Sequence, residues 1–346
     1  MDVLSDVLSA VRLTGAVFYD HHFRFPFAGA SPPMSAIADK VMPGSEHVIA
    51  FHALLSGTLW VALTDDPRSS IRLEAGDVVI FPMGDANVVG SSPGLSAEAD
   101  PSGYQRPVDR PLPWVFHHEG EGPERAHAIC GYLGCDARPF NPLLEALPRL
   151  FSTEMSAASQ SWLAEMLRVA AEESELGGVG SETMLARLAE AMFVEVLRKH
   201  IARLPEDSTG WFSGLRDRHV GQALRLLHSQ HARDWSLDVL AREVGLSRSV
   251  FAERFAHYVG ITPIQYLARW RMQLAARRLA TPGVSIAQAG AEVGYESEAA
   301  FSRAFKRYVG MPPGAWRTGR HPVTRAAPPP TRSFETAAFG RDANGS

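Results

Sequence analysis

Short apolar segments separated by turn residues make up the first ninety positions of the chain. Residues 49–55, 58–63 and 78–81 are rich in β-forming side chains, and Gly, Pro, Asp and Ser residues lie between them. Because no helical periodicity intervenes, these segments predict antiparallel strands in a sandwich or barrel. Residues 128–133 have the composition of a further strand, and residues 91–113, rich in Pro, Gly and Ser, predict a long surface loop.

The apolar pattern becomes helical near residue 141. Leucines recur at helical spacing between residues 143 and 150, and residues 162–171 and 183–200 each place apolar side chains on one face. A glycine-rich break at 177–181 separates the last two helices, and Ser181 is positioned to cap the second. Residues 141–203 therefore predict a helical connector.

An internal repeat occupies residues 236–317. At an offset of 50 residues, the segment SRSVFAERFAHYVGITP from Ser247 aligns with SEAAFSRAFKRYVGMPP from Ser297, and 7 of 17 positions are identical. The ten residues from Ser236 align with those from Ser285 at an offset of 49. The duplication predicts two copies of one structural unit.

Each copy has the sequence pattern of a helix-turn-helix. A serine precedes each predicted helix, and Ser285 with Gln288 has the spacing of a capping box. Gly245 and Gly294 fit a tight turn that requires a positive φ. These signals predict a short first helix, a turn and a second helix in both copies.

The apolar residues of each copy predict how its helices pack. A small residue, Ala241 or Gly290, stands where the two helices cross, and phenylalanines four residues apart bury one face of each second helix: Phe251 with Phe255, and Phe301 with Phe305. Residues 263–280 predict one continuous helix between the copies, roughly 27 Å long at ~1.5 Å per residue. That length is comparable to the ~34 Å between successive major-groove faces of B-DNA.

Charge is distributed unevenly along the chain. Residues 214–320 carry 16 Lys and Arg against 8 Asp and Glu, a net charge of +8, whereas residues 1–213 carry 15 against 28, a net charge of −13. This asymmetry predicts a polyanion-binding domain attached to a separate regulatory domain. No apolar run of 18 residues and no secretory signal pattern occurs, so we expect a cytoplasmic protein without a membrane span.

These motifs resemble a known family. The repeat region, from LAREVGLSRSVFAERF through GITPIQYLARWRMQLAARRLA to SEAAFSRAFKRYVGMPPGAWR, resembles the DNA-binding domain of the AraC/XylS family of bacterial transcription regulators over residues 215–318. The segments FHALLSGTLWVAL and LEAGDVVIFPMGD resemble the cupin-type sensor domain of the same family. The resemblance implies a DNA-binding transcription regulator that responds to a small-molecule effector.

The expected fold class is α+β and multidomain. An N-terminal cupin-like antiparallel β-barrel or sandwich followed by helices precedes a C-terminal all-α domain, in which a long helix joins two helix-turn-helix motifs. The expected segments are a cupin-like effector-binding domain at 1–140, a helical dimerisation connector at 141–203, a linker at 204–213, the tandem helix-turn-helix domain at 214–320 and a disordered tail at 321–346.

The resemblance implies that both second helices enter adjacent major grooves. The base-facing positions are then Ser249, Ala252, Glu253, Glu298, Ala299, Ser302 and Arg303. Arg303 can bond bidentately to a guanine, Glu253 can accept from a cytosine amino group, and the alanines offer apolar contact to a thymine methyl.

Other residues of the repeat suit the DNA backbone. Basic side chains can pair with phosphates, and capping serines can present helix N-terminal amides to them. We expect phosphate contacts at Ser236, Ser247, Arg248, Arg254, Ser285, Ser297, Lys306 and Arg307. For each basic residue, a solvated surface position is the alternative. Gly290 departs from the family pattern, which usually has Ala there, and a helical Gly costs about 1 kcal/mol relative to Ala.

The cupin-like segment lacks a complete metal-ligand set. His47 and His52 are five residues apart, which places them on opposite faces of a strand, and Asn87 stands where the resemblance implies a ligand His. The pairs His21-His22 and His117-His118 likewise point to opposite faces. We therefore expect no metal site, no cofactor and no catalytic residue.

A ligand pocket is still expected, because small barrels and sandwiches enclose one. The candidate lining residues are His52, Leu54, Trp60 and Phe81, which would equally suit an ordinary core. The expected partners are double-stranded promoter or operator DNA, RNA polymerase, a small-molecule effector and a second copy of the chain. Two alternatives remain: a metal-dependent cupin enzyme with an accessory DNA-binding domain, and an architectural DNA-binding protein without a ligand.

Overall fold

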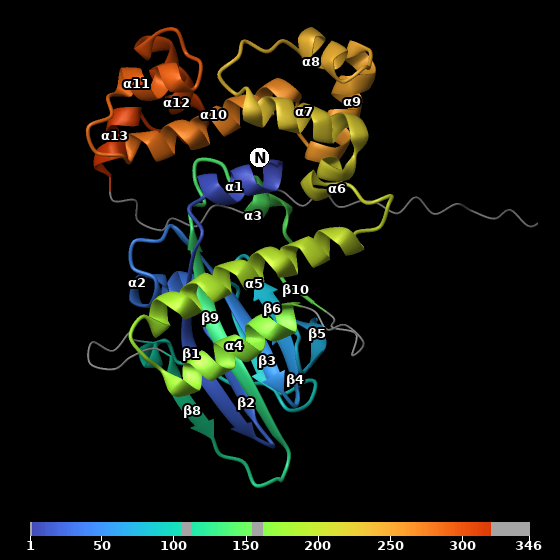
Figure 1. Ribbon diagram of the computed structural model, residues 1–346, viewed down its shortest axis with the longest axis vertical. Helices are drawn as coiled ribbons and strands as arrows, with labels where there is room; N and C mark the ends of the chain where they lie inside the picture. The colour runs from blue at the N-terminus through green and yellow to red at the C-terminus, as the bar shows by residue number, and fades with distance from the viewer. Residues whose placement is uncertain (1, 105–112, 154–161, 320–346) are drawn as a thin grey trace, which may run out of the picture.

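A sheet-rich N-terminal domain and a helical C-terminal domain make up the molecule (Figure 1). The computed structural model describes residues 2–104, 113–153 and 162–319. The class is α+β, with a cupin-like sheet domain and a helix-turn-helix domain, as the sequence predicts. The expected tail at 321–346 lies outside the described residues.

Two sheets form the N-terminal domain. One has six strands in the order β10-β6-β3-β9-β1-β8, and the other has four in the order β2-β7-β4-β5. The strands are β1 Thr14–Arg24, β2 Ala28–Ser31, β3 His47–Ser56, β4 Thr58–Leu63, β5 Asp66–Glu74, β6 Val78–Phe81, β7 Asn87–Gly90, β8 Trp114–His118, β9 Arg125–Cys135 and β10 Phe151–Ser152. The pairing is antiparallel, as expected, except that β8 runs parallel to β1.

Side chains alternate between two cores along the central strand β3. Val48, Ala50 and Leu54 face the space between the two sheets, whereas Ile49 and Phe51 face the helices that cover the larger sheet. The predicted strands at 49–55, 58–63 and 78–81 are confirmed as β3, β4 and β6. The strand predicted at 128–133 is part of β9.

Two long helices, α4 Trp162–Leu176 and α5 Ser181–Arg203, cover the outer face of the six-stranded sheet (Figure 1). Both confirm the predicted helical segments. The interpretation of Ser181 as the N-cap of α5 is wrong: Gly180, at φ +89°, holds that position, and Ser181 begins the helix with its hydroxyl donating to the carbonyl of Glu173. The leucines near residue 143 form only a short helix, α3 Pro142–Ala146.

The C-terminal domain contains two helix-turn-helix units at opposite ends of one long helix (Figure 1). The long helix is α10, Pro263–Leu279, which begins with a capping box between Thr262 and Gln265. The other helices are α6 Trp211–Arg216, α7 Arg218–Ser229, α8 Leu237–Glu243, α9 Arg248–Val259, α11 Ile286–Glu292, α12 Glu298–Val309 and α13 Pro313–Thr318. The predicted helix at 263–280 and both predicted motifs are confirmed as secondary structure.

A continuous apolar core joins the first helix-turn-helix unit to the N-terminal domain. It runs from the outer face of the six-stranded sheet through α4 and α5 to α7, α9 and Trp270 of α10. The N-terminal helix α1, Val3–Ala10, packs against α7 and α10 and belongs to this core. The second unit has its own core around Phe301 and Phe305. Short helices at Met34–Ala36, Ala38–Val41 and Pro101–Gly103 complete the fold.

Across the described residues, the helices are too short or too polar to span a membrane.

Candidate DNA-binding surface and effector pocket

Serine caps define the starts of the helices in both helix-turn-helix units. The hydroxyls of Ser236 and Ser285 accept from the amides of Val239 and Gln288, and Gln288 returns a bond to complete the predicted capping box. Ser247 and Ser297 cap the second helices in the same way. Their hydroxyls accept hydrogen bonds from the amides of Val250 and Ala300, respectively. All four serines are exposed at helix N-termini, where amide groups face outward.

A left-handed glycine forms the turn in each unit. Gly245 has φ +72° and Gly294 has φ +86°, as the sequence predicts. A Cβ atom at Gly294 would also collide with the backbone of Ala232, in the loop after α7. The second turn therefore packs directly on the first unit, which fixes the two units relative to each other at this point.

Gly290 has a steric reason to be glycine. A Cβ atom there would lie 2.9 Å from both Cβ and Cγ of Phe301, closer than real Cβ contacts. In the first unit Ala241 occupies the equivalent crossing point and is buried. The Phe301 ring is therefore closer to α11 than a standard alanine would allow.

The second helix of each unit has one buried and one exposed face. Phe251, Phe255, Phe301 and Phe305 are fully buried, and the ring centroids within each pair are 5.8 Å and 5.5 Å apart. The seven positions expected to face bases lie away from these rings. Ser249, Glu253, Glu298, Ala299 and Arg303 are exposed, whereas Ala252 and Ser302 are half-buried.

The basic residues expected at phosphates differ in their partners. Arg254 forms an ion pair with Asp217, the N-cap of α7, at 2.5 Å. Burial opposes ionisation of Asp217, yet the Arg254 guanidinium and two backbone amides lower the pKa of this carboxyl. Arg248 lies 3.3 Å from Asp238, and Arg307 lies over the ring of Tyr308. Lys306 is exposed on the last turn of α12.

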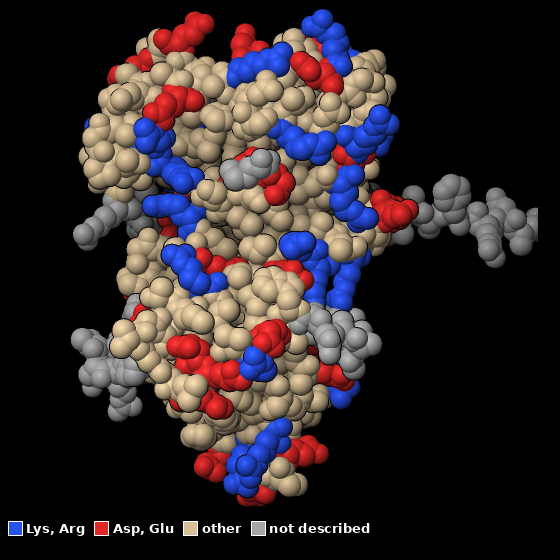
Figure 2. Space-filling model, in the orientation of Figure 1, with Lys and Arg blue, Asp and Glu red and all other residues tan. Residues whose placement is uncertain are grey.

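Charge of both signs lies on the face drawn in Figure 2. Lys and Arg side chains lie over the helical domain and its junction with the sheet domain, and acidic side chains gather around α4 and also occur over the helical domain. In the sequence, the net charge is +8 for residues 214–320 and −13 for residues 1–213. A polyanion is attracted to the helical end of the molecule.

A cavity of about 150 Å³ lies between the two sheets. Two of the four candidate residues, His52 and Leu54, line it. Trp60 instead borders a second cavity, of about 120 Å³, and Phe81 is fully buried in the core against the ring of His52. The other residues that line the first cavity, which the sequence did not indicate, are His21, Phe23, Phe27, Gly29, Ala30, Ser31, Leu59, Val61, Leu73, Val89, Tyr104, His118, Ala128 and Cys130.

Imidazoles supply part of the polar lining of this cavity, beside the hydroxyls of Ser31 and Tyr104. Nδ1 of His21 lies 2.8 Å from Nε2 of His118, and burial lowers the pKa of His21 to about 3. His52 bonds to the Asn87 amide oxygen at 3.0 Å and to the Cys130 sulfur at 2.8 Å, and burial lowers its pKa. Asn87, which stands where the family resemblance implies a ligand histidine, is therefore the hydrogen-bond partner of His52.

Metal-ligating side chains of the described residues gather elsewhere. Asp20, His22 and His127 lie within metal-binding distance of one another, on the opposite face of the six-stranded sheet from the cavity.

Comparisons with known proteins agree with the two-domain architecture. A family model described as Cupin matches residues 2–202, and one described as Helix-turn-helix domain matches residues 240–319. A putative AraC-like transcription regulator from Streptomyces lividans is 33% identical over 289 residues, which cover 78% of this chain and 93% of the relative. The chain belongs to the AraC-like transcription regulators.

Other relatives carry the same type of name. The regulator is 30% identical to the HTH-type transcriptional regulator AlkR of Acinetobacter baylyi, over 79% of this chain and 89% of that one. Among solved structures, the DNA-binding domain of AdpA in complex with a target DNA is 29% identical and covers 29% of this chain and 90% of that one, with a TM-score of 0.27. The regulator thus combines an N-terminal cupin domain with a C-terminal DNA-binding helix-turn-helix domain.

Proposed function

We propose that the regulator binds a bipartite promoter or operator sequence, with α9 and α12 in adjacent major grooves. The observation that supports this most directly is the pair of capped helix-turn-helix units at the two ends of α10. The residues that would face bases are Ser249, Ala252, Glu253, Glu298, Ala299, Ser302 and Arg303. These positions are exposed or half-buried, whereas the phenylalanines on the other face are buried and hold each helix in place.

In this proposal, Arg303 contributes most to the discrimination between bases. It is exposed on α12, and a bidentate contact from arginine to guanine is worth about 1–3 kcal/mol of discrimination. Lys306, Arg307 and Arg248 would contact phosphates, together with the amides at the four serine caps. Arg254 would reach a phosphate only by leaving Asp217, so we assign it to positioning α9 on α7.

We infer that the cavity between the sheets binds a compact effector. Its volume, about 150 Å³, suits a molecule about the size of benzene, and its aromatic and aliphatic walls favour an apolar body. The imidazoles of His21, His52 and His118 offer hydrogen bonds to one polar group. A ligand of this kind must raise the Tm of the wild-type chain, and it must fail to do so in Ala128→Leu, where the cavity is partly filled.

The organisation of the chain supports a route from effector to DNA. We propose the boundaries 1–140, 141–203, 204–213 and 214–320 for the sensor, connector, linker and DNA-binding segments, with α1 packed on the DNA-binding helices α7 and α10. A ligand that stabilises one arrangement of the sensor would then bias how the two units are presented to DNA. The connector helices would pair two copies of the chain, and RNA polymerase would be contacted at the promoter.

We also propose that the regulator is cytoplasmic and is not an enzyme. The cavity places His52 beside Asn87 and Cys130, and the burial of the Cys130 sulfur raises the pKa of its thiol, which opposes a nucleophilic role. A metal-dependent cupin enzyme would instead hold its ion at these cavity residues. Loss of a bound ion in His52→Asn would favour the enzyme alternative.

Selection of bound sequences from a random DNA pool tests the DNA-binding proposal. Full-length protein should select two half-sites about one helical turn apart. Arg303→Ala should relax one base in only one half, with a loss of roughly 5- to 150-fold at that base, equivalent to about 1–3 kcal/mol.

Lys306→Ala is the matched control for this selection. It should weaken binding to all sequences about equally. It should also reduce the slope of log affinity against log salt concentration by about 1, since it removes one phosphate contact. Salt-sensitive binding without any selected motif would contradict base reading by α9 and α12. That outcome would favour an architectural DNA-binding protein.

A further inference from the structure

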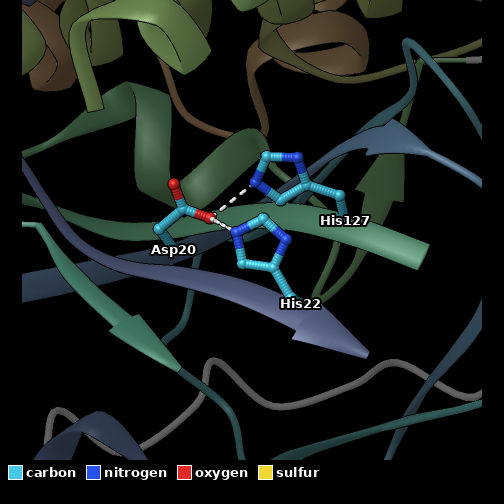
Figure 3. Close-up of side chains that lie close together, drawn as sticks. All are labelled: Asp20, His22 and His127. Atoms are coloured by element: carbon cyan, nitrogen blue, oxygen red, sulfur yellow. Dashed lines mark hydrogen bonds and ion pairs between the residues drawn. The ribbon is translucent and has the colours of Figure 1, made fainter. Parts of the chain in front are cut away.

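Two histidines and one aspartate converge on the outer face of the six-stranded sheet. Asp20 and His22 are two residues apart on β1 and share this face, and His127 lies directly opposite His22 on β9. Nε2 of His127 is 2.5 Å from Oδ1 of Asp20, and Nε2 of His22 is 3.3 Å from the same oxygen (Figure 3). Three strand positions thus aim their polar atoms at one point.

The separation of these atoms suits a bound transition-metal ion. Zinc–nitrogen distances of about 2.0–2.1 Å and tetrahedral angles place neighbouring ligand atoms ~3.3 Å apart. The three ligand atoms of the cluster all lie within 4.8 Å of one another. Nε2 of His22 is already 3.3 Å from Oδ1 of Asp20, whereas Nε2 of His127, at 2.5 Å, must move away from that oxygen to reach the spacing of two ligands. Each imidazole would then carry its remaining proton on Nδ1.

The carboxylate of Asp20 is a buried anion without a permanent cation beside it. Its side chain is 1% exposed, and its ion-pair partners among the described residues are His22 and His127. Burial of a charge is costly unless another charge compensates it. A divalent ion at the convergence point supplies that charge.

A second hydrogen bond already orients the carboxylate. The hydroxyl of Ser174, on α4, donates to Oδ2 of Asp20 at 2.6 Å and leaves Oδ1 directed toward the two histidines. Ligating carboxylates in metal sites are commonly held by partners of this kind. The bond also links the cluster to the connector helix, so a bound ion would fasten α4 to β1 and β9.

The cluster is open on one side. The His22 side chain is 36% exposed, and the ring of His117, on β8, stacks on it with centroids 4.9 Å apart. An ion can therefore enter from solvent and keep water, or His117 after a rotation, as a further ligand. His21, the neighbour of His22 in sequence, points the other way and lines the cavity between the sheets, so the two sites are separate.

We propose that Asp20, His22 and His127 bind one divalent transition-metal ion of the zinc type on the outer face of the sheet, with Ser174 orienting the carboxylate. Two imidazoles and a carboxylate suit zinc. They do not suit magnesium or calcium, which prefer oxygen ligands alone. The site requires neither the proposed operator nor the proposed effector. It adds a metal-dependent link between the sheet and the connector helix.

The test uses full-length protein without an affinity tag, stripped with a chelator and titrated with zinc chloride against a chromophoric competitor. Wild type should bind one zinc ion at this site, with an increase in Tm, and magnesium chloride should give neither. Asp20→Asn and His22→Asn should each weaken zinc binding at least 100-fold. His22 is partly exposed, so its variant keeps the fold even if the buried Asp20→Asn does not.

Three further variants locate the ion. Ser174→Ala should weaken zinc binding about 10- to 100-fold, as expected for a partner that orients a ligand. His257→Asn, at an exposed histidine on α9, is the matched control and should leave binding unchanged. Unchanged affinity in His22→Asn, or loss of the ion in His52→Asn instead, would overturn the proposal.

Discussion

Gly290 shows how closely the second helix-turn-helix unit is packed. The Phe301 side chain occupies the space in which any larger residue at 290 would place its Cβ. From sequence, this glycine departs from the family pattern and predicts a helix weakened by about 1 kcal/mol relative to alanine. The structure explains why glycine is present despite this cost: α11 and α12 approach each other too closely for a side chain at residue 290.

Gly290→Ala should lower the stability of the second unit. Overpacking costs about 1–3 kcal/mol, and the gain in helix propensity offsets only about 1 kcal/mol of it. We expect a lower Tm and weaker binding to the half-site read by α12, measured by thermal denaturation and by binding to mutated operators. A rise in stability of about 1 kcal/mol would mean that the Phe301 side chain moves aside freely.

His228 is a neutral histidine inside the domain junction. It stacks on Trp270, bonds to the Tyr266 hydroxyl at 2.9 Å and lies 3.8 Å from the Asp6 carboxylate of α1. Burial, and then the nearby His231, lower its pKa to about 3, while burial raises the pKa of Asp6. Protonation of His228 is therefore opposed in the folded state.

The stability of the regulator should fall with acid because of His228. The unfolded chain takes up a proton near pH 6.5 and the folded chain only near pH 3. Stability from this group is thus complete above pH 6.5 and declines by about 1.4 kcal/mol per pH unit below it. Urea denaturation at several pH values gives the slope of the unfolding free energy against pH. In His228→Gln, this slope should be smaller by about 1.4 kcal/mol per pH unit below pH 6.5. Equal slopes in the two proteins would contradict a neutral, buried His228.

At the scale of single elements, β1 places different side chains on its two faces. Tyr19, His21 and Phe23 face the inner core or the cavity, and Asp20 and His22 face the connector helices. The sequence correctly predicted that His21 and His22 point in opposite directions. It did not predict β1 itself, because three polar residues in succession interrupt the apolar pattern from which strands are recognised.

The connector helices expose apolar side chains that a second copy could cover. Leu176, Val179 and Met184, at the turn between α4 and α5, are exposed, as is Trp162 at the start of α4. We expect light scattering to give about twice the 37.7 kDa mass of one chain. Leu176→Glu with Met184→Glu should shift this mass toward the monomer, whereas Val115→Glu, at an exposed apolar residue on β8, should not. A wild-type monomer at all concentrations would exclude pairing through these helices.

At the scale of the whole molecule, Gln273 joins three segments that are far apart in sequence. Its side-chain oxygen accepts from the amide of Phe140 at 3.1 Å, and its side-chain nitrogen donates to the carbonyl of Ala10 at 3.4 Å. It is 1% exposed, on α10 between the two DNA-binding units. The sensor domain therefore contacts the helix that sets the spacing of those units.

Gln273→Ala should loosen the contact between the sensor and α10. It leaves a buried amide and a buried carbonyl without partners, at about 1–3 kcal/mol each. Hydrogen exchange at the Phe140 amide should accelerate, and the influence of an effector on DNA binding should weaken. Arg277→Ala, which removes an exposed 3.4 Å bond to Ser9, is the control and should change neither. Normal protection of Phe140 in the Gln273 variant would contradict this role.

The helix-turn-helix region was predictable from sequence because its determinants are local. Caps, turn glycines and phenylalanines four residues apart act within about a dozen residues, and the duplication repeats them. The two-domain order, the three apolar strands and the long helix α10 follow from the same short-range patterns. Of the four candidate pocket residues, His52 and Leu54 line the cavity, but most of its lining was not indicated by the sequence.

Only the tertiary structure decided which distant residues meet. The cavity depends on which strands face each other across the two sheets, so Trp60 and Phe81 lie outside it while His118 and Tyr104 line it. The cluster at Asp20 needs the register that places His127 opposite His22, more than a hundred residues later. Strand pairing over such separations is set by the packing of the whole domain, because local propensity specifies faces and not partners.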